Sequence, residues 1–407
     1  MSLAIDAKRE PTYTPALAVM TSLFFVWGLI TSLNDILIPH LKAIFTLNYL
    51  QAMLIQFCFF GAYFIMSLPA GHLVEKIGYR LGIVVGLCTA AVGCLGFYPA
   101  AAAQSYPLFL AALFVLASGI TLLQVAANPC VASLGSAQSA PSRLNLSQAF
   151  NSLGTTIGPL LGAAFILSGS GDGAATAAQE IDTVKAPYLA LAAVLLVIGV
   201  AFTRFHLPAG VDGGDRARAP RAGGLLQHRH LVLGTIAIFL YVGAEVAIGS
   251  VLVNFMAQPE VGGLSERAAG SYLALYWGGA MVGRFIGAGL LRMFDPGRVL
   301  AWCALGAVLL LIATMSLSGP LAMWAALAVG LCNSIMFPTI FALSISMLGP
   351  RTGEGSGLLC MAIMGGAIVP VIMGFAADQL GLTAAFAVPL VCYLYIAHFG
   401  VSGHRVR

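Results

Sequence analysis

Charged residues are scarce in this sequence. Asp, Glu, Lys and Arg make up 8% of the 407 residues, whereas soluble domains carry about 25%. Hydrophobic residues make up 59%, and the mean hydropathy is +0.94. A soluble globular protein is therefore excluded, and the chain is predicted to lie in a lipid bilayer.

Several chemical signatures are also missing. The eight cysteines form no C-x-x-C pair, so neither a disulfide framework nor a zinc site is indicated. There is no Gly-x-x-x-x-Gly-Lys loop and no His-Glu-x-x-His motif, which argues against ATP hydrolysis and metalloprotease chemistry. The polar stretch 1–15 has no signal-peptide cleavage site. We therefore expect no enzyme, no metal, no cofactor beyond a transported proton or sodium ion, and no nucleic-acid partner.

Long apolar runs dominate what is present. A helix needs about 20 apolar residues to cross the hydrocarbon core, and the alternating pattern of a membrane β-barrel is absent. The sequence therefore predicts an all-α membrane protein with twelve transmembrane helices. The expected spans are 16–44, 51–74, 81–100, 106–133, 145–168, 187–205, 231–256, 268–290, 299–317, 320–348, 355–377 and 382–402.

The polar segment 206–230 divides these spans into six and six. Its Arg, His, Gly, Ala and Pro content is typical of a solvated linker. We expect an N-terminal six-helix bundle over 1–205, a cytoplasmic linker over 206–230 and a C-terminal six-helix bundle over 231–407.

Internal similarities relate the two halves. The stretches Gly71–Arg80 and Gly289–Arg298 share Gly first, Leu third and Arg tenth. In the first half, Gln124 lies five residues before Pro129, and Asn333 lies five residues before Pro338 in the second half. Likewise Gly154 lies five residues before Pro159, and Gly365 lies five residues before Pro370. Two pseudo-symmetric bundles that rock around a site at the membrane midplane are the basis of alternating access.

Basic residues predict the orientation, because cytoplasmic loops carry most of the Lys and Arg. With both termini cytoplasmic, only Lys42, Lys185 and Arg267 lie outside, and Arg284 falls inside a helix. The predicted cytoplasmic set is Lys8, Arg9, Lys76, Arg80, Arg143, Arg204, Arg216, Arg218, Arg221, Arg229, Arg292, Arg298, Arg351, Arg405 and Arg407.

An acid lies in the first long apolar run. Trp27, Thr31, Asn34 and Asp35 follow a spacing that puts them on one helix face. A carboxylate inside the membrane must face a cavity or a partner, or bind a proton, because burial disfavours its charged form. Asp35 is therefore predicted to bind the coupling cation, with a structural hydrogen bond to a neighbouring helix as the alternative.

Amide side chains form two further faces. Gln124 and Asn128 share a face of the fourth span, and Gln148 and Asn151 share one of the fifth. Amides offer donors and acceptors to a neutral polyhydroxy ligand without the desolvation cost of full charges. The alternative is hydrogen bonding between helices, a common use of such residues in membrane bundles.

Glu245 is a second intramembrane acid. It can bind the coupling cation or a sugar, or pair with Arg284, or have an unrelated structural role. Asn333 is a further candidate ligand, and Trp27 is a candidate platform for the apolar face of a sugar ring.

The stretch Gly71–Arg80 resembles the signature loop of the major facilitator superfamily, with Glu75 where that family usually has Asp. More specific are Trp27–Leu37, Val125–Pro129 and Arg143–Ser152, which are similar to the branch of fucose, glucose and galactose transporters. The resemblance is strongest to bacterial glucose/galactose permeases. It departs at Gln124, where fucose symporters carry a second acid.

The resemblance implies gating roles for Glu75, Lys76 and Arg80, and we extend this to Arg298 in the second repeat. It also implies a monomer in the bacterial inner membrane that imports glucose or galactose. Together with Asp35 it favours symport with a proton or sodium ion. An uncoupled facilitator and a fucose-type proton symporter stay open, and a drug exporter and a non-transporting sugar sensor are disfavoured by the amide faces and by the lack of a signalling module.

Overall fold

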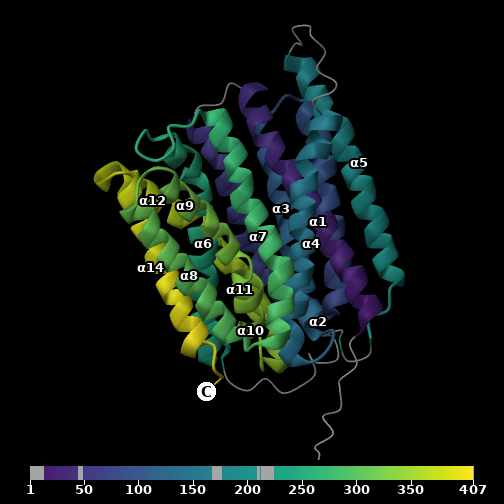
Figure 1. Ribbon diagram of the computed structural model, residues 1–407. Helices are drawn as coiled ribbons and strands as arrows, with labels where there is room; N and C mark the ends of the chain where they lie inside the picture. The colour runs from purple at the N-terminus through teal and green to yellow at the C-terminus, as the bar shows by residue number, and fades with distance from the viewer. Residues whose placement is uncertain (1–12, 45–48, 167–176, 209–210, 212–223, 407) are drawn as a thin grey trace, which may run out of the picture.

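The computed structural model describes residues 13–44, 49–166, 177–208, 211 and 224–406, and side chains within 13–32, 54–158, 187–208, 211 and 224–406. The described chain is helical and holds no strand (Figure 1). The first half contains α1 (Thr14–Ile44), α2 (Tyr49–Ala102), α3 (Tyr106–Ser133), α4 (Ala140–Ile166) and α5 (Ala177–Arg204). The second half contains α6 (Arg229–Ala257), α7 (Glu266–Met293), α8 (Pro296–Ser316), α9 (Gly319–Asn333), α10 (Met336–Ser344), α11 (Thr352–Met361), α12 (Gly365–Leu380), α13 (Leu382–Ala385) and α14 (Ala387–His398).

Helix α2 contains two of the predicted spans. Its backbone leaves the helical region at Gly78, where φ is 85°. A residue with a Cβ rarely adopts this conformation, so glycine permits the sharp reversal between the two spans. The predicted loop 75–80 is therefore a turn inside one nearly continuous helical element.

Two predicted spans of the second half are each broken. The run 320–348 forms α9 and α10, and the run 355–377 forms α11 and α12. Pro338 has no N–H to donate to the carbonyl of Ser334, which lies four residues earlier in the gap between α9 and α10. The predicted span 320–348 corresponds to one apolar stretch, Gly319–Ser344, and its helix is interrupted at Ser334 and Ile335 for this reason.

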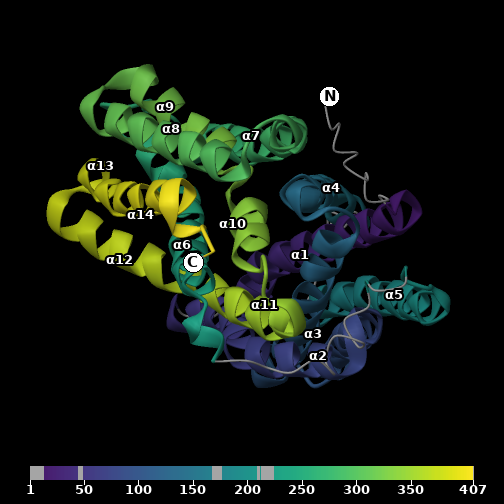
Figure 2. The same cartoon turned by 90° about the horizontal axis from the view of Figure 1, so that it is seen from below.

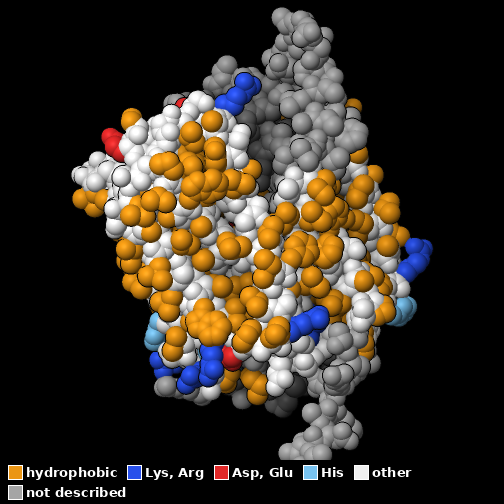
Figure 3. All heavy atoms as spheres, in the orientation of Figure 1, with side chains coloured by type: hydrophobic (Ala, Val, Ile, Leu, Met, Phe, Trp, Pro, Cys, Tyr) orange, Lys and Arg blue, Asp and Glu red, His pale blue; other side chains and the backbone are white. Residues whose placement is uncertain are grey.

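Nine stretches of the described residues are long and apolar enough to span a membrane. With α2 counted as two crossings and the more polar α4 and α7 added, the helices make the predicted twelve crossings. Figure 3 shows hydrophobic side chains across the middle of one face of the molecule. This is the surface expected of a protein surrounded by lipid.

Helices α1 to α5 lie on one side and α6 to α9 with α12 to α14 on the other (Figure 2). Helix α11 packs against α2 and α3 of the first half, and α10 lies between α6 and α4. Among the described side chains, hydrogen bonds between the halves gather toward the end at which Gly78, Ser136 and Gly349 lie, which we call the closed end. There Ser142 Oγ donates to the carbonyl of Ala288 at 2.6 Å.

Glycines hold two equivalent helix pairs close together. A Cβ at Gly154 of α4 would overlap the backbone oxygen of Phe25 in α1, and a Cβ at Gly365 of α12 would overlap that of Phe239 in α6. The two glycines occupy matching places in the internal repeat, so the repeat extends to the packing of the helices. The close α1–α4 packing places Trp27 of α1 beside the amide-bearing face of α4.

Candidate functional site

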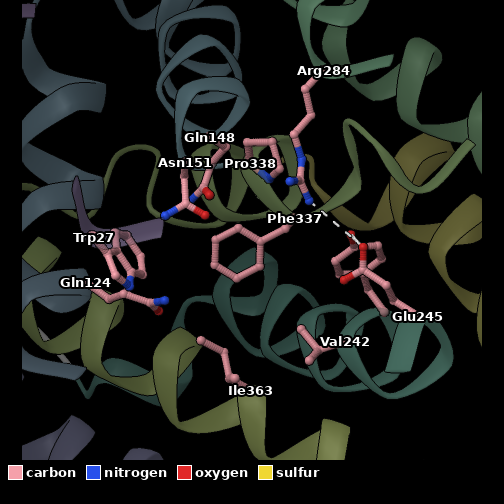
Figure 4. A pocket seen from close by; sticks show the side chains of 11 residues that line it. Trp27, Gln124, Gln148, Asn151, Val242, Glu245, Arg284, Phe337, Pro338 and Ile363 are labelled. Atoms are coloured by element: carbon pink, nitrogen blue, oxygen red, sulfur yellow. Dashed lines mark hydrogen bonds and ion pairs between the residues drawn. The ribbon is translucent and has the colours of Figure 1, made fainter. Parts of the chain in front are cut away.

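A cavity of about 160 Å³ with polar and apolar lining lies between the two halves, and Figure 4 shows the side chains that line it. Residues from α1, α3 and α4 line one side, and residues from α6, α7, α10 and the turn before α12 line the other. The lining residues are Trp27, Gln124, Gln148, Asn151, Tyr241, Val242, Glu245, Arg284, Phe337, Pro338 and Ile363.

The first half contributes the amides and an indole. Trp27, Gln124, Gln148 and Asn151 all line the cavity, as the sequence places them on inward helix faces. Asn151 Nδ2 donates to the carbonyl of Phe24 at 3.0 Å. This bond holds the amide in place and does not use its oxygen. The Gln148 side chain makes no hydrogen bond to the described residues. This wall therefore offers amide donors and acceptors to a ligand.

The second half contributes the charged groups. Glu245 lies on α6, and its Oε1 is 2.8 Å from the hydroxyl of Tyr241, one turn earlier on the same helix. The Arg284 guanidinium lies 3.9 Å from the same oxygen. The two side chains are 13% and 16% exposed, so the pair is buried but opens on the cavity.

Arg284 of α7 also contacts the turn between α9 and α10 and helix α4. Its Nε donates to the carbonyl of Ser334 at 3.2 Å, and its Nη1 donates to Ser152 Oγ on α4. The sequence identifies Arg284 as an intramembrane cation without assigning its role, and the structure places it in the cavity wall and at the contact between the halves.

Apolar groups complete the lining. Phe337 lies near the centre of the view in Figure 4, with Trp27 to one side and the Glu245–Arg284 pair to the other. Val242 and Ile363 lie below it in that view. The cavity therefore combines hydrogen-bonding groups with aromatic and aliphatic surfaces, the combination that a sugar ring with hydroxyls and C–H faces requires.

Two predicted ligands lie outside the lining. Asn333 is fully buried behind the cavity: its Nδ2 donates to the hydroxyl of Tyr276 at 2.8 Å, and its Oδ1 accepts from Tyr393 at 2.6 Å. Its amide is therefore used inside the second half. Asn128 is fully buried one helical turn beyond Gln124, and its amide has no hydrogen-bond partner among the described residues.

Asn34 and Asp35 belong to α1, but their side chains lie outside those that the structure describes. Their predicted contacts with a cation or a sugar stay predictions. The backbone of α1 carries them two turns beyond Trp27, away from the closed end.

The predicted gating residues lie at the closed end. Glu75 is buried, and its Oε1 accepts a hydrogen bond of 3.0 Å from the N–H of Glu354 in the first turn of α11. Arg80 donates to the carbonyl of Phe205 within the first half at 3.4 Å. Lys76 and Arg298 are exposed. The hydrogen bond of Glu75 to Glu354 joins the two halves.

Tyr241 and Phe337 line the cavity but are not among the ligands predicted from the sequence. Tyr241 precedes Glu245 by four residues, a spacing that places both on one helix face. Phe337 follows Asn333 by four residues and adjoins Pro338. Those spacings are the signals that could have identified both residues.

Two related helical halves around a buried polar cavity define a secondary membrane transporter, and comparisons with known proteins agree. The profile of the Major Facilitator Superfamily matches residues 19–362. The chain belongs to this superfamily, and it is a multi-pass membrane transporter and not an enzyme.

Relatives cover nearly the whole chain. The "Glucose/galactose transporter" of Brucella abortus biovar 1 is 55% identical over 403 residues, which are 99% of this chain and 97% of that protein. The "Putative glucose/galactose transporter" of Helicobacter pylori is 46% identical over 406 residues, 98% of each chain.

Solved structures show the same fold. The crystal structure of the Escherichia coli fucose:proton symporter FucP matches with a TM-score of 0.89 and 34% identity, over 96% of this chain and 99% of that chain. A crystal structure of FucP in the outward conformation matches with the same TM-score at 35% identity, over the same shares of the two chains.

Proposed function

We propose that this protein is a monomeric importer of a hexose, glucose or galactose, which couples uptake to the entry of a proton or sodium ion by alternating access. The names of the relatives from Brucella abortus and Helicobacter pylori support the choice of hexose. The name of the FucP structure supports cation coupling within the same fold.

The observation that carries the proposal is the lining of the central cavity. Gln124, Gln148 and Asn151 face it from the first half, and Trp27 and Phe337 provide aromatic surface. Amides both donate hydrogen bonds to sugar hydroxyls and accept them, and the rings cover the apolar faces of a pyranose. A lipophilic drug would need a wider cavity with fewer buried amides.

The closed end is proposed to face the bacterial cytoplasm. Lys76, Arg80, Arg204, Arg298 and Arg351 lie at this end of the fold, as the positive-inside rule requires of the cytoplasmic side. The structure then corresponds to a state that is shut toward the cytoplasm. Its similarity to FucP in the outward conformation supports this assignment.

Asp35 and Glu245 are proposed as the coupling pair. Glu245 belongs to the cavity wall of the second half, and α1, which carries Asp35, belongs to the first half. A cation that prefers the same state as the sugar makes the two affinities reciprocal. Asn34 is proposed to assist at the Asp35 end of the site.

Transport into proteoliposomes tests these assignments. Purified protein is reconstituted with an imposed proton gradient, a sodium gradient or no gradient, and the accumulation of labelled glucose and galactose is measured. We expect one ion gradient to drive accumulation, and Asp35→Asn to abolish accumulation while allowing exchange of internal for external sugar.

Asp378→Asn provides the matched control, because this acid of α12 lies outside the cavity lining. Gradient-driven accumulation by Asp35→Asn would refute the role of Asp35. A wild-type protein that transports neither hexose would refute the substrate.

An uncoupled facilitator is the second candidate. It is favoured by the position of Arg284, whose guanidinium lies 3.9 Å from Glu245 Oε1 and offsets the charge of the carboxylate in the described part of the lining. Sugar counterflow that responds to neither ion gradient would identify this function.

A further inference from the structure

Arg284 binds a backbone carbonyl at the interruption between α9 and α10 that Pro338 causes. Pro338 cannot donate to the carbonyl of Ser334, and Arg284 Nε takes that carbonyl at 3.2 Å. The matched proline of the first half, Pro129, likewise leaves the carbonyl of Val125 open, and Ser356 donates to it at 2.8 Å. The guanidinium of Arg284 thus has one fixed partner in its own half.

Its two remaining contacts point to different halves. Nη1 donates to Ser152 Oγ of α4, while Nη2 lies 3.9 Å from Glu245 Oε1. Charge-assisted hydrogen bonds are normally about 2.7–2.9 Å long, so the contact with Glu245 is incomplete. The same carboxylate oxygen is held by Tyr241 at 2.8 Å.

The link to Ser152 depends on closure. Asn145 of α4 donates to the backbone carbonyl of Arg284 at 2.7 Å, and Ser142 donates to that of Ala288 at 2.6 Å. These bonds join α4 to α7 from the cavity toward the closed end. Because Arg284 and Ser152 belong to this α4–α7 contact, a separation of the two helices at the closed end would break the bond between them.

We propose that Arg284 is a positioning residue that changes partner during the transport cycle: it binds Ser152 when the closed end is shut and pairs fully with Glu245 when that end opens. While the end is shut, the Glu245 carboxylate can accept bonds from a ligand in the cavity. After opening, Arg284 occupies that carboxylate and weakens ligand binding on this side. This release role rests on the proposed transport of a hexose, whereas the partner change is independent of the ligand.

The partner change can be measured without sugar. Spin labels at A137C and M347C, with the exposed Cys88 changed to Ser, report opening, because Ala137 and Met347 line the surface groove between the halves at the closed end. We expect Ser152→Ala to raise the open population and Glu245→Gln to lower it. Both effects should disappear when Arg284→Gln is combined with either change, as a double-mutant cycle requires.

Arg292 provides the matched control. It lies two turns further along α7, and its Nε donates to Ser142 Oγ of α4 at 3.3 Å, but it is absent from the cavity lining. Arg292→Gln should favour opening and leave the effect of Glu245→Gln intact. If the shifts from Ser152→Ala and Glu245→Gln have the same sign, or persist without Arg284, the partner change is refuted.

Sugar release provides the functional test. In proteoliposomes of known orientation, the half-saturating glucose concentration is measured from each side. Arg284→Gln should lower it about fivefold on the closed-end side, a coupling of ordinary size, and change it less than about twofold on the other side. Exchange should persist while net uptake falls.

Equal changes on both sides would refute the release role. A wild type that binds neither glucose nor galactose would instead refute the proposed substrate. The distances between the spin labels, measured without sugar, would still test whether Arg284 changes its partner.

Discussion

The hydroxyl of Ser356 in α11 donates to the carbonyl of Val125 in α3 at 2.8 Å. This carbonyl is available because Pro129, four residues later, has no N–H to offer it. A serine of the second half thus supplies the hydrogen bond that a proline of the first half cannot donate. The bond forms only when the two halves meet at the closed end.

Ser356→Ala should therefore favour opening of the closed end. The change leaves a buried carbonyl unpaired and removes a bond worth about 1 kcal/mol net, so the ratio of closed to open molecules should fall about fivefold. Distances between labels at A137C and M347C measure the ratio.

Ser344→Ala is the control for this prediction, since Ser344 is a buried serine of the same half whose hydroxyl bonds to Ile340 within its own helix. An unchanged ratio in Ser356→Ala would show that the bond to Val125 does not hold the end shut.

Glu75→Gln should open the same end by a different route. The amide can still accept the N–H of Glu354, but the negative charge near the N-terminus of α11 is lost. Such charge–dipole interactions contribute about 0.3–1 kcal/mol, so we expect a smaller shift than that of Ser356→Ala. Lys76→Gln, an exposed neighbour, should leave the label distances unchanged; an equal shift in both variants would implicate general surface charge.

The sequence could predict most of the cavity wall in the first half. Gln124, Gln148 and Asn151 lie within long apolar helices, where polar residues face the bundle interior, and helical spacing alone puts them on common faces. Trp27 follows from its place on the polar face of α1. Glu245 was identified for the same reason.

The contacts of the polar residues in the second half could not be predicted from helical spacing. Asn333 looks like a ligand in sequence, but Tyr276 of α7 and Tyr393 of α14 reach it from distant parts of the chain and use its amide. The contact of Arg284 with Ser152 joins residues 132 positions apart. Such pairings depend on how helices are arranged in three dimensions, which periodicity along one helix does not encode.

The two aromatic rings of the cavity lining, Trp27 and Phe337, should contribute to sugar affinity. Trp27→Ala and Phe337→Ala each remove a ring from the cavity lining, and aromatic contacts are worth about 0.5–1.5 kcal/mol beyond buried area. We expect glucose binding, measured by calorimetry on purified protein, to weaken about tenfold in each variant. Trp302→Ala removes an exposed indole on α8 and should leave the affinity unchanged; an equal loss there would point to a general effect on folding.

The matched glycines Gly154 and Gly365 should contribute to the stability of the fold. Alanine is the better helix former by about 1 kcal/mol, but in Gly154→Ala the new methyl group overlaps the backbone of Phe25, and in Gly365→Ala that of Phe239. Because backbone atoms cannot turn aside as a side chain can, the helices must move apart, and overpacking of this kind costs about 1–3 kcal/mol or more. Gly374→Ala in α12 meets no atom within 4 Å and should be neutral or stabilising. Thermal unfolding in detergent compares the three variants, and a midpoint for Gly154→Ala and Gly365→Ala as high as that of Gly374→Ala would show that these crossings tolerate greater separation. Both crossings lie beside the cavity, so their loss should lower sugar affinity together with stability.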